Sequence, residues 1–475
     1  MFALVVWESS MVSIDRVRAD LREHLAGVVL RHGVAGASVA VAIGEETAEA
    51  VAGVVNVRTG VPVTVDAVFQ IQSITKVWTA TLVMQLVDEG LVGLDDPVVD
   101  HLPGFRTADA AASARITVRH LLTHTGGFEG DLWMATTRGD DALQRLVEDW
   151  VPRAAQYEEP GSRYSYCSAG MAVLGRLVEV KRGASFAAVL RARLADPLGV
   201  EEIAFDADGA LGFNAAVGHV GGGGGKRPLP VWATMHESNP AAGNRLAMSA
   251  RALCAFGRMH VGDGLGPEGA RVLSAASARA MREAGPVLPG FGGSRAVGLG
   301  WEVVDGGAVV RHGGGAIGFE SSLVLVPAHR MVVAVLVNDG GLAGVMRDLV
   351  EPWVEAAAGV VPGPAPVLLG RAESLAGVER YAGVYALGIE RVAVSVVEGR
   401  VERSFTPLGE SRSMMERAGL VPESFTEEIR RVSGDLFAAV GPDGAAGALM
   451  EFLDADGAGR ARFLHTGRRS VPRVG

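Results

Sequence analysis

Ser73 and Lys76 are the residues of this 475-residue chain whose types and spacing most directly suggest covalent chemistry. A serine hydroxyl attacks a carbonyl carbon only when a neighbouring base takes its proton. Arginine keeps its charge in a protein, whereas a desolvated lysine can release a proton. The chain uses arginine almost throughout and has only three lysines, Lys76, Lys181 and Lys226. The lysine three residues after Ser73 therefore indicates a base for that hydroxyl.

The segment around this pair is predicted to form a helix. Apolar residues recur with helical period over positions 74–87, and Gly90 supplies a stop signal. Residues three apart share a helix face, so Ser73 and Lys76 are expected to point the same way. Ser73 would lie in the first turn, where free N–H groups favour an oxyanion. The alternative is a serine that only caps the helix and a solvated lysine, because a Ser-x-x-Lys pair alone is a short motif.

Two further segments carry polar side chains and glycines beside predicted elements. Tyr166-Cys167-Ser168 opens a helix, and the segment Arg311 to Phe319 ends one predicted strand and leads to the next. With the Ser73–Lys76 pair they resemble the serine β-lactamase and penicillin-binding-protein family, specifically its class C and esterase-like branch. That family carries Tyr-x-Asn at the second place and Lys-Thr-Gly or His-x-Gly at the third. The resemblance covers about residues 13–358 and includes the stretch 121–127.

The resemblance implies that Ser73 is the nucleophile and forms an acyl-enzyme. Lys76 would activate it or keep the local field positive. Tyr166 would be the general base or proton relay, since a neighbouring ammonium favours an ionised phenol. The structural alternative for Tyr166 is an ordinary aromatic residue at a helix start.

The third motif would complete the site. The backbone N–H groups of Ser73 and Gly315 are the implied oxyanion hole. His312 would line the pocket and bind the substrate or Tyr166, although it could also simply cap a strand. The implied substrate-binding residues are Ser168, Gly313 and Gly314.

Two departures from the family pattern bear on the substrate. Ser168 stands where relatives have an asparagine whose amide bridges the lysine and the substrate, which argues against amide or β-lactam turnover more than against simple acyl transfer. His312 is largely neutral at pH 7, so it does not supply the cation that a penicillin carboxylate needs. The sequence therefore predicts a serine hydrolase of the Ser-Lys-Tyr type, in the first place an esterase acting on small carboxylic esters.

Other functions use the same residues. A transacylase, a D-amino-acid peptide hydrolase or cyclase, and a β-lactamase all fit, and the sequence does not decide between water and another acyl acceptor. A non-catalytic binding homologue is the alternative of a different class, motivated by Ser168. His120 and His124 lie four apart on one predicted helix face, but no third metal ligand stands out, so a structural role is expected and no metal or cofactor is predicted.

Composition restricts the partners. The net charge of −10, from 44 basic and 54 acidic residues, argues against nucleic acid. Two cysteines exclude a disulfide scaffold. No apolar run reaches the length of a membrane span, and the apolar run at the N-terminus is too short for a signal peptide, so a cytoplasmic location is the default expectation. Met11 is a candidate start. The expected partner is a small ester, amide or acyl compound, with no membrane contact and no prediction of oligomeric state.

The predicted elements must bring these three motifs together. Strands over 39–44 and 48–57 precede the Ser73 helix, and residues 91–296 have mainly helical and loop patterns. The patterns further predict strands over 297–304, 308–311, 321–326 and 331–337, and helices over 13–32 and 341–358. Strands at both ends predict an α+β fold, with an antiparallel sheet flanked by helices and an inserted helical region beside a cleft. The resemblance implies that this fold is β-lactamase-like.

The chain is predicted to divide into two domains. Residues 1–358 form the β-lactamase-like serine hydrolase domain, 359–372 a Pro/Gly-rich linker, and 373–475 a small all-β domain. Alternating short runs predict a β-sandwich or β-barrel for the last part, and the resemblance implies a lipocalin-like barrel. The glycine run 221–225 does not match a phosphate-binding loop and is expected to be a mobile loop.

Overall fold

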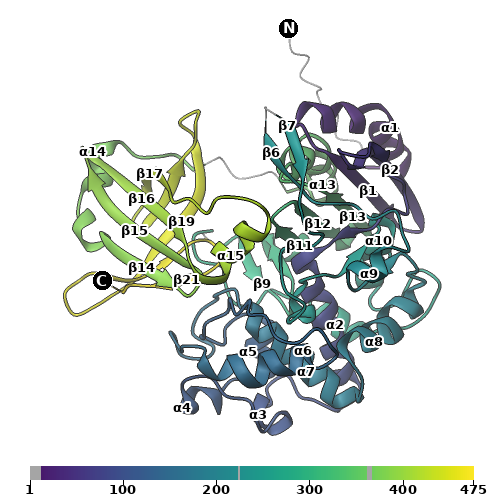
Figure 1. Cartoon of the computed structure of the whole chain (residues 1–475), viewed down its shortest axis with the longest axis horizontal. Helices are drawn as coiled ribbons and strands as arrows, with labels where there is room; N and C mark the ends of the chain where they lie inside the picture. The colour runs from purple at the N-terminus through teal and green to yellow at the C-terminus, as the bar shows by residue number, and fades with distance from the viewer. Residues whose placement is uncertain (1–11, 223–224, 292, 361–365, 475) are drawn as a thin grey trace.

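The computed structural model describes residues 12–222, 225–291, 293–360 and 366–474 (Figure 1). The apolar N-terminal run, the candidate start Met11 and part of the expected linker lie outside these residues.

The larger part of the molecule is built on an eight-stranded antiparallel sheet with the order β3-β2-β1-β13-β12-β11-β10-β9. Its strands are β1 (Gly36–Ile43), β2 (Glu46–Asn56), β3 (Val61–Pro62), β9 (Arg295–Val297), β10 (Glu302–Val304), β11 (Val309–Ala316), β12 (Phe319–Val326) and β13 (Met331–Val337). Strands β1 and β13 pair directly, with Val39 opposite Val335, so early and late segments of the chain meet in the centre of the sheet. The expected α+β class is confirmed.

Helices cover both faces of this sheet. The covering helices are α1 (Ile14–Arg31) and α13 (Glu351–Ala358) on one face, and α2 (Thr75–Asp88) and α10 (Ala250–Val261) on the other. Alternate residues of β1 pack into opposite cores: Val39 and Val41 belong with α1 and α13, whereas Ala40 and Ala42 belong with α2 and α10. This period of two follows from the pleat of a strand.

The inserted region between β3 and β9 is mainly helical, as expected. Its helices are α3 (Val98–His101), α4 (Ala110–Ser113), α5 (Val118–Leu122), α6 (Ala142–Arg145), α7 (Ser168–Arg182), α8 (Phe186–Leu190), α9 (Ala207–Ala210) and α11 (Ala275–Ala280), in addition to α2 and α10. A small sheet of β4 (Phe69–Gln70), β8 (Ala247–Met248) and β5 (Ile203–Ala204) joins its ends. Helix α12 (Leu342–Val345) precedes α13.

Three local predictions were wrong. The apolar run 297–304 is not one strand but the hairpin β9–β10, since Gly300 adopts φ 88° and lets the chain turn back. The predicted strand 308–311 is too short, because β11 continues through the third motif to Ala316 before the chain turns at Gly318. The described ends of the glycine run 221–225 are strand residues rather than loop residues, because they belong to the paired strands β6 (His219–Gly222) and β7 (Gly225–Pro228); positions 223 and 224 lie outside the described residues.

The C-terminal part is all-β, as expected. After α14 (Arg371–Leu375), eight antiparallel strands follow in sequence order: β14 (Gly383–Leu387), β15 (Glu390–Val397), β16 (Arg400–Pro407), β17 (Phe425–Ser433), β18 (Leu436–Val440), β19 (Ala446–Ala455), β20 (Ala461–His465) and β21 (Ser470–Pro472). Tyr385 of β14 bridges to Arg473, just beyond β21, so the sheet nearly closes on itself. Of the two predicted forms, this favours the barrel over the sandwich.

The barrel packs beside the larger part, with α15 (Gly409–Arg417) between them (Figure 1). Trp133 and Tyr157 of the inserted region pack against the core of the barrel. Arg163 and Asp454 form an ion pair between the two parts at 3.0 Å. These apolar and polar contacts dock the barrel against the helical region.

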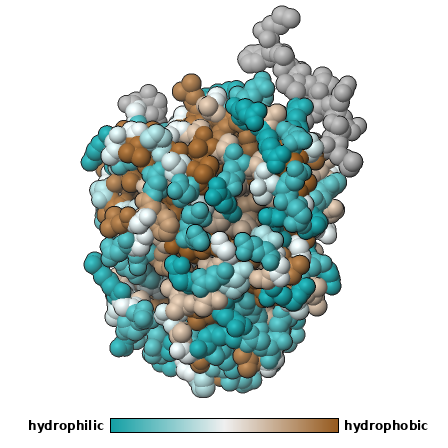
Figure 2. All heavy atoms as spheres, turned by 90° about the vertical axis from the view of Figure 1, so that its right-hand side faces the viewer, coloured by the Kyte–Doolittle hydropathy of each residue, from teal (hydrophilic) through white to brown (hydrophobic). Residues whose placement is uncertain are grey.

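The surface on the α1 side is mainly hydrophilic, with hydrophobic residues in small groups (Figure 2). Among the described residues, no helix has both the length and the apolar character needed to cross a bilayer.

Trp353 provides a test of the packing between α13 and α1. Its ring is buried, and its Nε1–H donates to Asp20 Oδ2 at 3.0 Å. Trp353→Phe removes this donor, so we expect the free energy of unfolding to fall by about 1–3 kcal/mol, the cost of leaving a buried acceptor short of a partner. Leu30→Ala, on the exposed face of α1, is the control and is expected to stay within about 0.5 kcal/mol of the unaltered protein. Equal urea midpoints for both variants would contradict the assignment.

Candidate active site

Ser73 lies on a 3₁₀ turn, Gln72–Ile74, that leads directly into α2. The expected position in the first helical turn is therefore shifted into the turn that precedes it. Gln72 has φ 51°, a left-handed conformation unusual for a residue with a side chain. The turn is attached to the sheet, because Ser321 Oγ of β12 donates to the Ile71 carbonyl oxygen at 2.9 Å. Ser73 itself is half-buried.

Lys76 is buried in the first turn of α2, with only 1% of its surface exposed. Its Nζ donates to Ser73 Oγ at 3.1 Å and to the carbonyl oxygen of Ala242 at 2.8 Å. In the described part of the chain no carboxylate forms an ion pair with this ammonium. A buried charge is costly unless polar partners replace water, and here a hydroxyl and a carbonyl oxygen serve as these partners.

Asn239 holds the carbonyl group that receives Lys76. Its side-chain amide donates to the Ser168 carbonyl oxygen at 3.0 Å and accepts from the Ala242 N–H at 3.1 Å. Asn239 thus joins the second motif to the anchor of the lysine, and it is fully buried. It was not among the residues predicted from the sequence; its position before Pro240 in a turn was the available signal.

The ring of Tyr166 lies beside the lysine. The centroid of the Tyr166 ring lies 4.8 Å from Lys76 Nζ and 4.7 Å from the centroid of the His124 ring. His124 Nδ1 accepts from the backbone N–H of Cys167 at 3.2 Å, which fixes the segment that carries Tyr166. His124 therefore belongs to the site, although only a structural role was predicted for it.

The expected helix face shared by His120 and His124 does not exist. Helix α5 ends at Leu122, and His124 has φ 55°, so the two imidazoles are not on one helical surface. Within the described residues no group of three or more His, Cys, Asp or Glu side chains could hold a metal ion.

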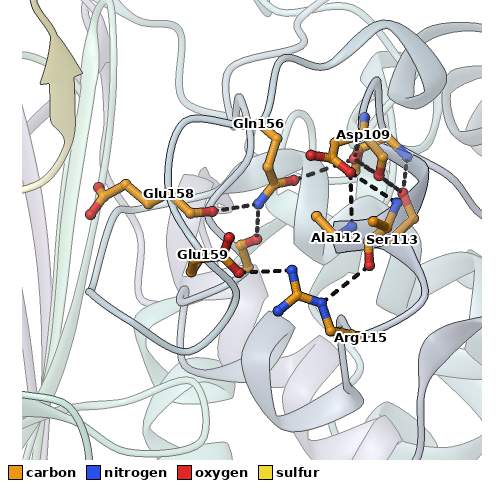
Figure 3. A network of polar contacts seen from close by, with 10 residues as sticks. Asp109, Ala112, Ser113, Arg115, Gln156, Glu158 and Glu159 are labelled. Carbon is orange, nitrogen blue, oxygen red and sulfur yellow. Dashed lines mark hydrogen bonds and ion pairs between the residues drawn. The ribbon is translucent and has the colours of Figure 1, made fainter.

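The loop after His124 is held by the polar network shown in Figure 3. The amide of Gln156 donates to the carbonyl oxygens of Gly126, at 2.8 Å, and Glu158, at 2.7 Å. Arg115 pairs with Glu159 at 2.7 Å on the outer side of the same loop. This network keeps the backbone around His124 in place while the histidine faces inward.

A cavity of about 470 Å³ opens beside this group. Its walls come from the inserted region, from the β9–β11 end of the sheet and from the C-terminal barrel, which contributes Gly447–Leu449 and Thr466–Arg468. Of the expected site residues, Tyr166, His312 and Gly313 line it. Five others lie outside the lining set: Ser73, Lys76, Ser168, Gly314 and Gly315. Tyr166 on the cavity wall lies beside Lys76, which is hydrogen-bonded to Ser73.

The two histidines of the cavity are held neutral. Burial and the charge of Lys76 lower the pKa of His312 to about 4. The same two causes lower the pKa of His124 well below its usual range. Burial by itself would raise the pKa of Glu302. The charge of Arg311, whose Nη2 lies 2.9 Å from Glu302 Oε1, outweighs the effect of burial and lowers this pKa. Near neutral pH the positive charges on the cavity wall are therefore those of arginine side chains, among them Arg468 of the barrel.

This arrangement, a serine hydroxyl bonded to a buried lysine beside a tyrosine, suits acyl transfer through a covalent serine ester. The sequence model of the Beta-lactamase family matches residues 17–357, and the chain belongs to this family. Its relatives are serine hydrolases named as penicillin-binding proteins, esterases and D-aminopeptidases.

Three relatives show the range of the similarity. Penicillin-binding protein 4 of Amycolatopsis lactamdurans is 41% identical over 347 residues, which are 72% of this chain and 91% of that protein. Esterase EstB of Burkholderia gladioli is 33% identical over 173 residues, 32% of this chain and 42% of the esterase. The structure of SurE with D-Leu has a TM-score of 0.72 and 27% identity, and covers 97% of this chain and 99% of SurE. The likeness to SurE thus extends over the barrel.

Gly314 tests whether the sheet positions the nucleophile. A Cβ at this residue would overlap the Ile71 carbonyl oxygen and the Ser321 hydroxyl, the two groups that attach the Ser73 turn to β12. We expect Gly314→Ala to slow labelling of Ser73 by a fluorophosphonate at least tenfold, because an error of about 1 Å at a reacting group costs on the order of 10²-fold. Gly340→Ala, where a Cβ meets nothing within 4 Å, is the control and should be labelled at the original rate. Equal labelling rates would show that the turn is held independently of β11.

Proposed function

We propose that this protein is a serine hydrolase that acts through an acyl-enzyme on Ser73, and that its substrates are small carboxylic esters. The observation that carries the proposal is the hydrogen bond of 3.1 Å between Ser73 Oγ and the Nζ of a buried lysine. The structural alternative requires a lysine that is exposed to solvent, whereas only 1% of the surface of Lys76 is exposed. A non-catalytic homologue has no need to bury an ammonium beside a serine hydroxyl.

The reaction proceeds in two balanced steps. In the first, Ser73 Oγ forms a bond to the carbonyl carbon of the ester while its proton passes to the Lys76–Tyr166 pair. The tetrahedral oxyanion is stabilised by backbone N–H groups, for which we propose Ser73 and Gly315. The C–O bond to the alcohol then breaks, and the stored proton goes to the leaving alkoxide. In the second step water attacks the acyl carbon and gives up a proton to the same pair. The bond between this carbon and Ser73 Oγ then breaks, the proton returns from the pair to Oγ, and the acid is released.

Esters fit this site better than amides for a physical reason. An alkoxide can leave before it is protonated, whereas an amine must be protonated before the C–N bond can break. Amide turnover therefore depends more on a group that places a proton at the leaving nitrogen. The asparagine that relatives carry at the place of Ser168 is absent, and the amide of Asn239 is occupied by two backbone groups. The neutral His312 supplies no cation for a penicillin carboxylate.

Two variants test the chemistry. Ser73→Ala is expected to abolish hydrolysis of p-nitrophenyl butyrate and labelling by a fluorophosphonate, since it removes the attacking atom. Lys76→Arg keeps a positive charge but cannot accept a proton, so we expect kcat to fall at least about 10²-fold, the typical contribution of a general base. Lys181→Arg, on the last turn of α7, is the matched control and should retain full activity. Full activity of Ser73→Ala, or a near-normal kcat of Lys76→Arg, would refute the assigned roles.

Acyl transfer to a D-amino acid is a second candidate function. It is favoured by the likeness over both parts of the chain to SurE, of which one structure was determined with D-Leu. Arg468 adds a chemical reason, because a guanidinium on the cavity wall can bind the carboxylate of an amino acid acceptor. In this reaction the amine of the acceptor replaces water in the second step, and the acyl group leaves as an amide.

This candidate is tested by offering D-Leu and L-Leu as acceptors during turnover of p-nitrophenyl butyrate. We expect N-butyryl-leucine to form at least about tenfold faster from the D-isomer, a difference within the range that one well-placed polar contact can supply. Arg468→Gln should lose the transfer product while ester hydrolysis persists. Mass spectrometry of the products measures both reactions. Equal yields from the two isomers, or hydrolysis alone, would contradict acyl transfer to D-residues.

A further inference from the structure

One turn of the C-terminal barrel, Thr466–Arg469 between β20 and β21, contacts the segment that carries Tyr166. The backbone N–H of Tyr166 donates to the Arg468 carbonyl oxygen at 2.8 Å. The residues on either side are held as well: the Ser470 N–H donates to Ser165 Oγ at 3.2 Å, and His465 Nε2 is 3.2 Å from the Tyr164 carbonyl oxygen. Three consecutive residues before α7 are therefore bound to the second domain.

Arg469 extends this contact to the tyrosine side chain. Its guanidinium carbon is 5.5 Å from the centroid of the Tyr166 ring, and its Nη2 donates to Asp131 Oδ1 at 2.6 Å. Asp131 is buried in the inserted region, so the arginine crosses from one domain to the other. Burial by itself would lower the pKa of Arg469. The ion pair with Asp131 outweighs the effect of burial and raises the pKa of the guanidinium above its usual range.

Tyr166 thus has a cation from each domain near its ring, Lys76 at 4.8 Å and Arg469 at 5.5 Å. The other ionisable side chains around it are His124 after α5, Tyr164 before α7, Glu302 of β10, His312 of β11 and Arg468 of the same turn. Glu302 is paired with Arg311, and Asp131 with Arg469. Where the family pattern allows a lysine, His312 is neutral above about pH 4 because of burial and Lys76, which lower its pKa.

We propose that Arg469 of the C-terminal barrel is a positioning residue of the active site, which fixes the ring of Tyr166 and adds a second positive charge that favours its ionised form. This inference rests on the proposed role of Tyr166 as the proton acceptor. It makes the barrel part of the catalytic machinery rather than an appendage, since the larger domain alone would have Lys76 but not the second cation at the tyrosine. The energetic reason is that a nearby opposite charge stabilises a phenolate.

The test uses the full chain with three variants. Arg469→Gln combined with Asp131→Asn removes the cation together with the carboxylate that pairs with it; Glu390 of β15, which also interacts with Arg469, is left in place. Arg469→Lys keeps the charge and changes the shape. Asp454→Asn is the matched control, because it breaks another ion pair between the domains, Arg163–Asp454. Thermal unfolding of each variant shows whether the two parts remain folded.

For the double variant, we expect the acid limb of kcat/KM on p-nitrophenyl butyrate to move to higher pH by about one unit, the low end of the effect of a nearby opposite charge. Arg469→Lys should keep the original limb to within about 0.3 pH unit, and Asp454→Asn should leave it unchanged. A double variant with less activity at every pH but an unmoved limb would overturn the proposal and reduce Arg469 to a docking contact. An equal shift in Asp454→Asn would overturn it as well.

A second measurement does not depend on turnover. Ultraviolet difference absorbance follows tyrosinate formation as pH rises, and a Tyr166→Phe variant identifies the contribution of Tyr166. We expect this contribution to appear at higher pH in the double variant than in the unaltered protein. If the protein proves not to hydrolyse esters, the proposed function fails but this titration still reports the effect of Arg469. An identical titration in both proteins would overturn the inference whatever the activity.

Discussion

The buried ammonium of Lys76 is the constraint on which the active site depends. A charge that is 1% exposed must find polar partners, and it has Ser73 Oγ, the Ala242 carbonyl oxygen and the face of the Tyr166 ring. The three partners come from three different segments of the chain. Because all of them must contact the same amine, their relative positions are fixed. The same contacts give the serine hydroxyl a neighbour that can exchange a proton with it.

The rest of the larger domain supports these three segments. Strand β12 holds the Ser73 turn through Ser321, and Asn239 holds Ala242 and the start of α7 together. The loop of His124 packs against Tyr166 and is itself held by Gln156. Membership of the Beta-lactamase family accounts for the shared sheet and helices. In this chain, however, polar groups outside the three motifs, above all Asn239 and His124, complete the contacts around the lysine and the tyrosine.

The cavity is lined by arginine side chains and by no lysine among the described residues. The third motif carries a histidine that remains neutral near pH 7, while the barrel contributes Arg468 to the cavity wall and Arg469 beside the Tyr166 ring. Arginine binds carboxylates in a bidentate manner and cannot act as a base. The proposed roles are therefore divided: lysine and tyrosine exchange protons, while arginines of the second domain orient groups and supply a constant field.

The sequence by itself determined the main elements and the proximity of Ser73 and Lys76. Periodicity located α1, β1, β2 and α2, and the spacing of Ser73 and Lys76 put both on one side of a helical segment, because such patterns depend only on neighbouring residues. It also predicted an all-β C-terminal part from alternation and turn residues. It missed the hairpin at Gly300 and the continuation of β11 through the third motif, since an apolar run does not reveal where a glycine bends the chain.

Only the tertiary structure decided which distant residues complete the site. Nothing in the local pattern of Asn239, His124 or Arg469 distinguishes a site residue from an ordinary capping, core or surface residue. Arg469 lies near the opposite end of the chain from Lys76, and it approaches the same ring only because the barrel docks on the helical region. Contacts of this kind are created when whole domains pack together, and no periodicity of a single segment records them.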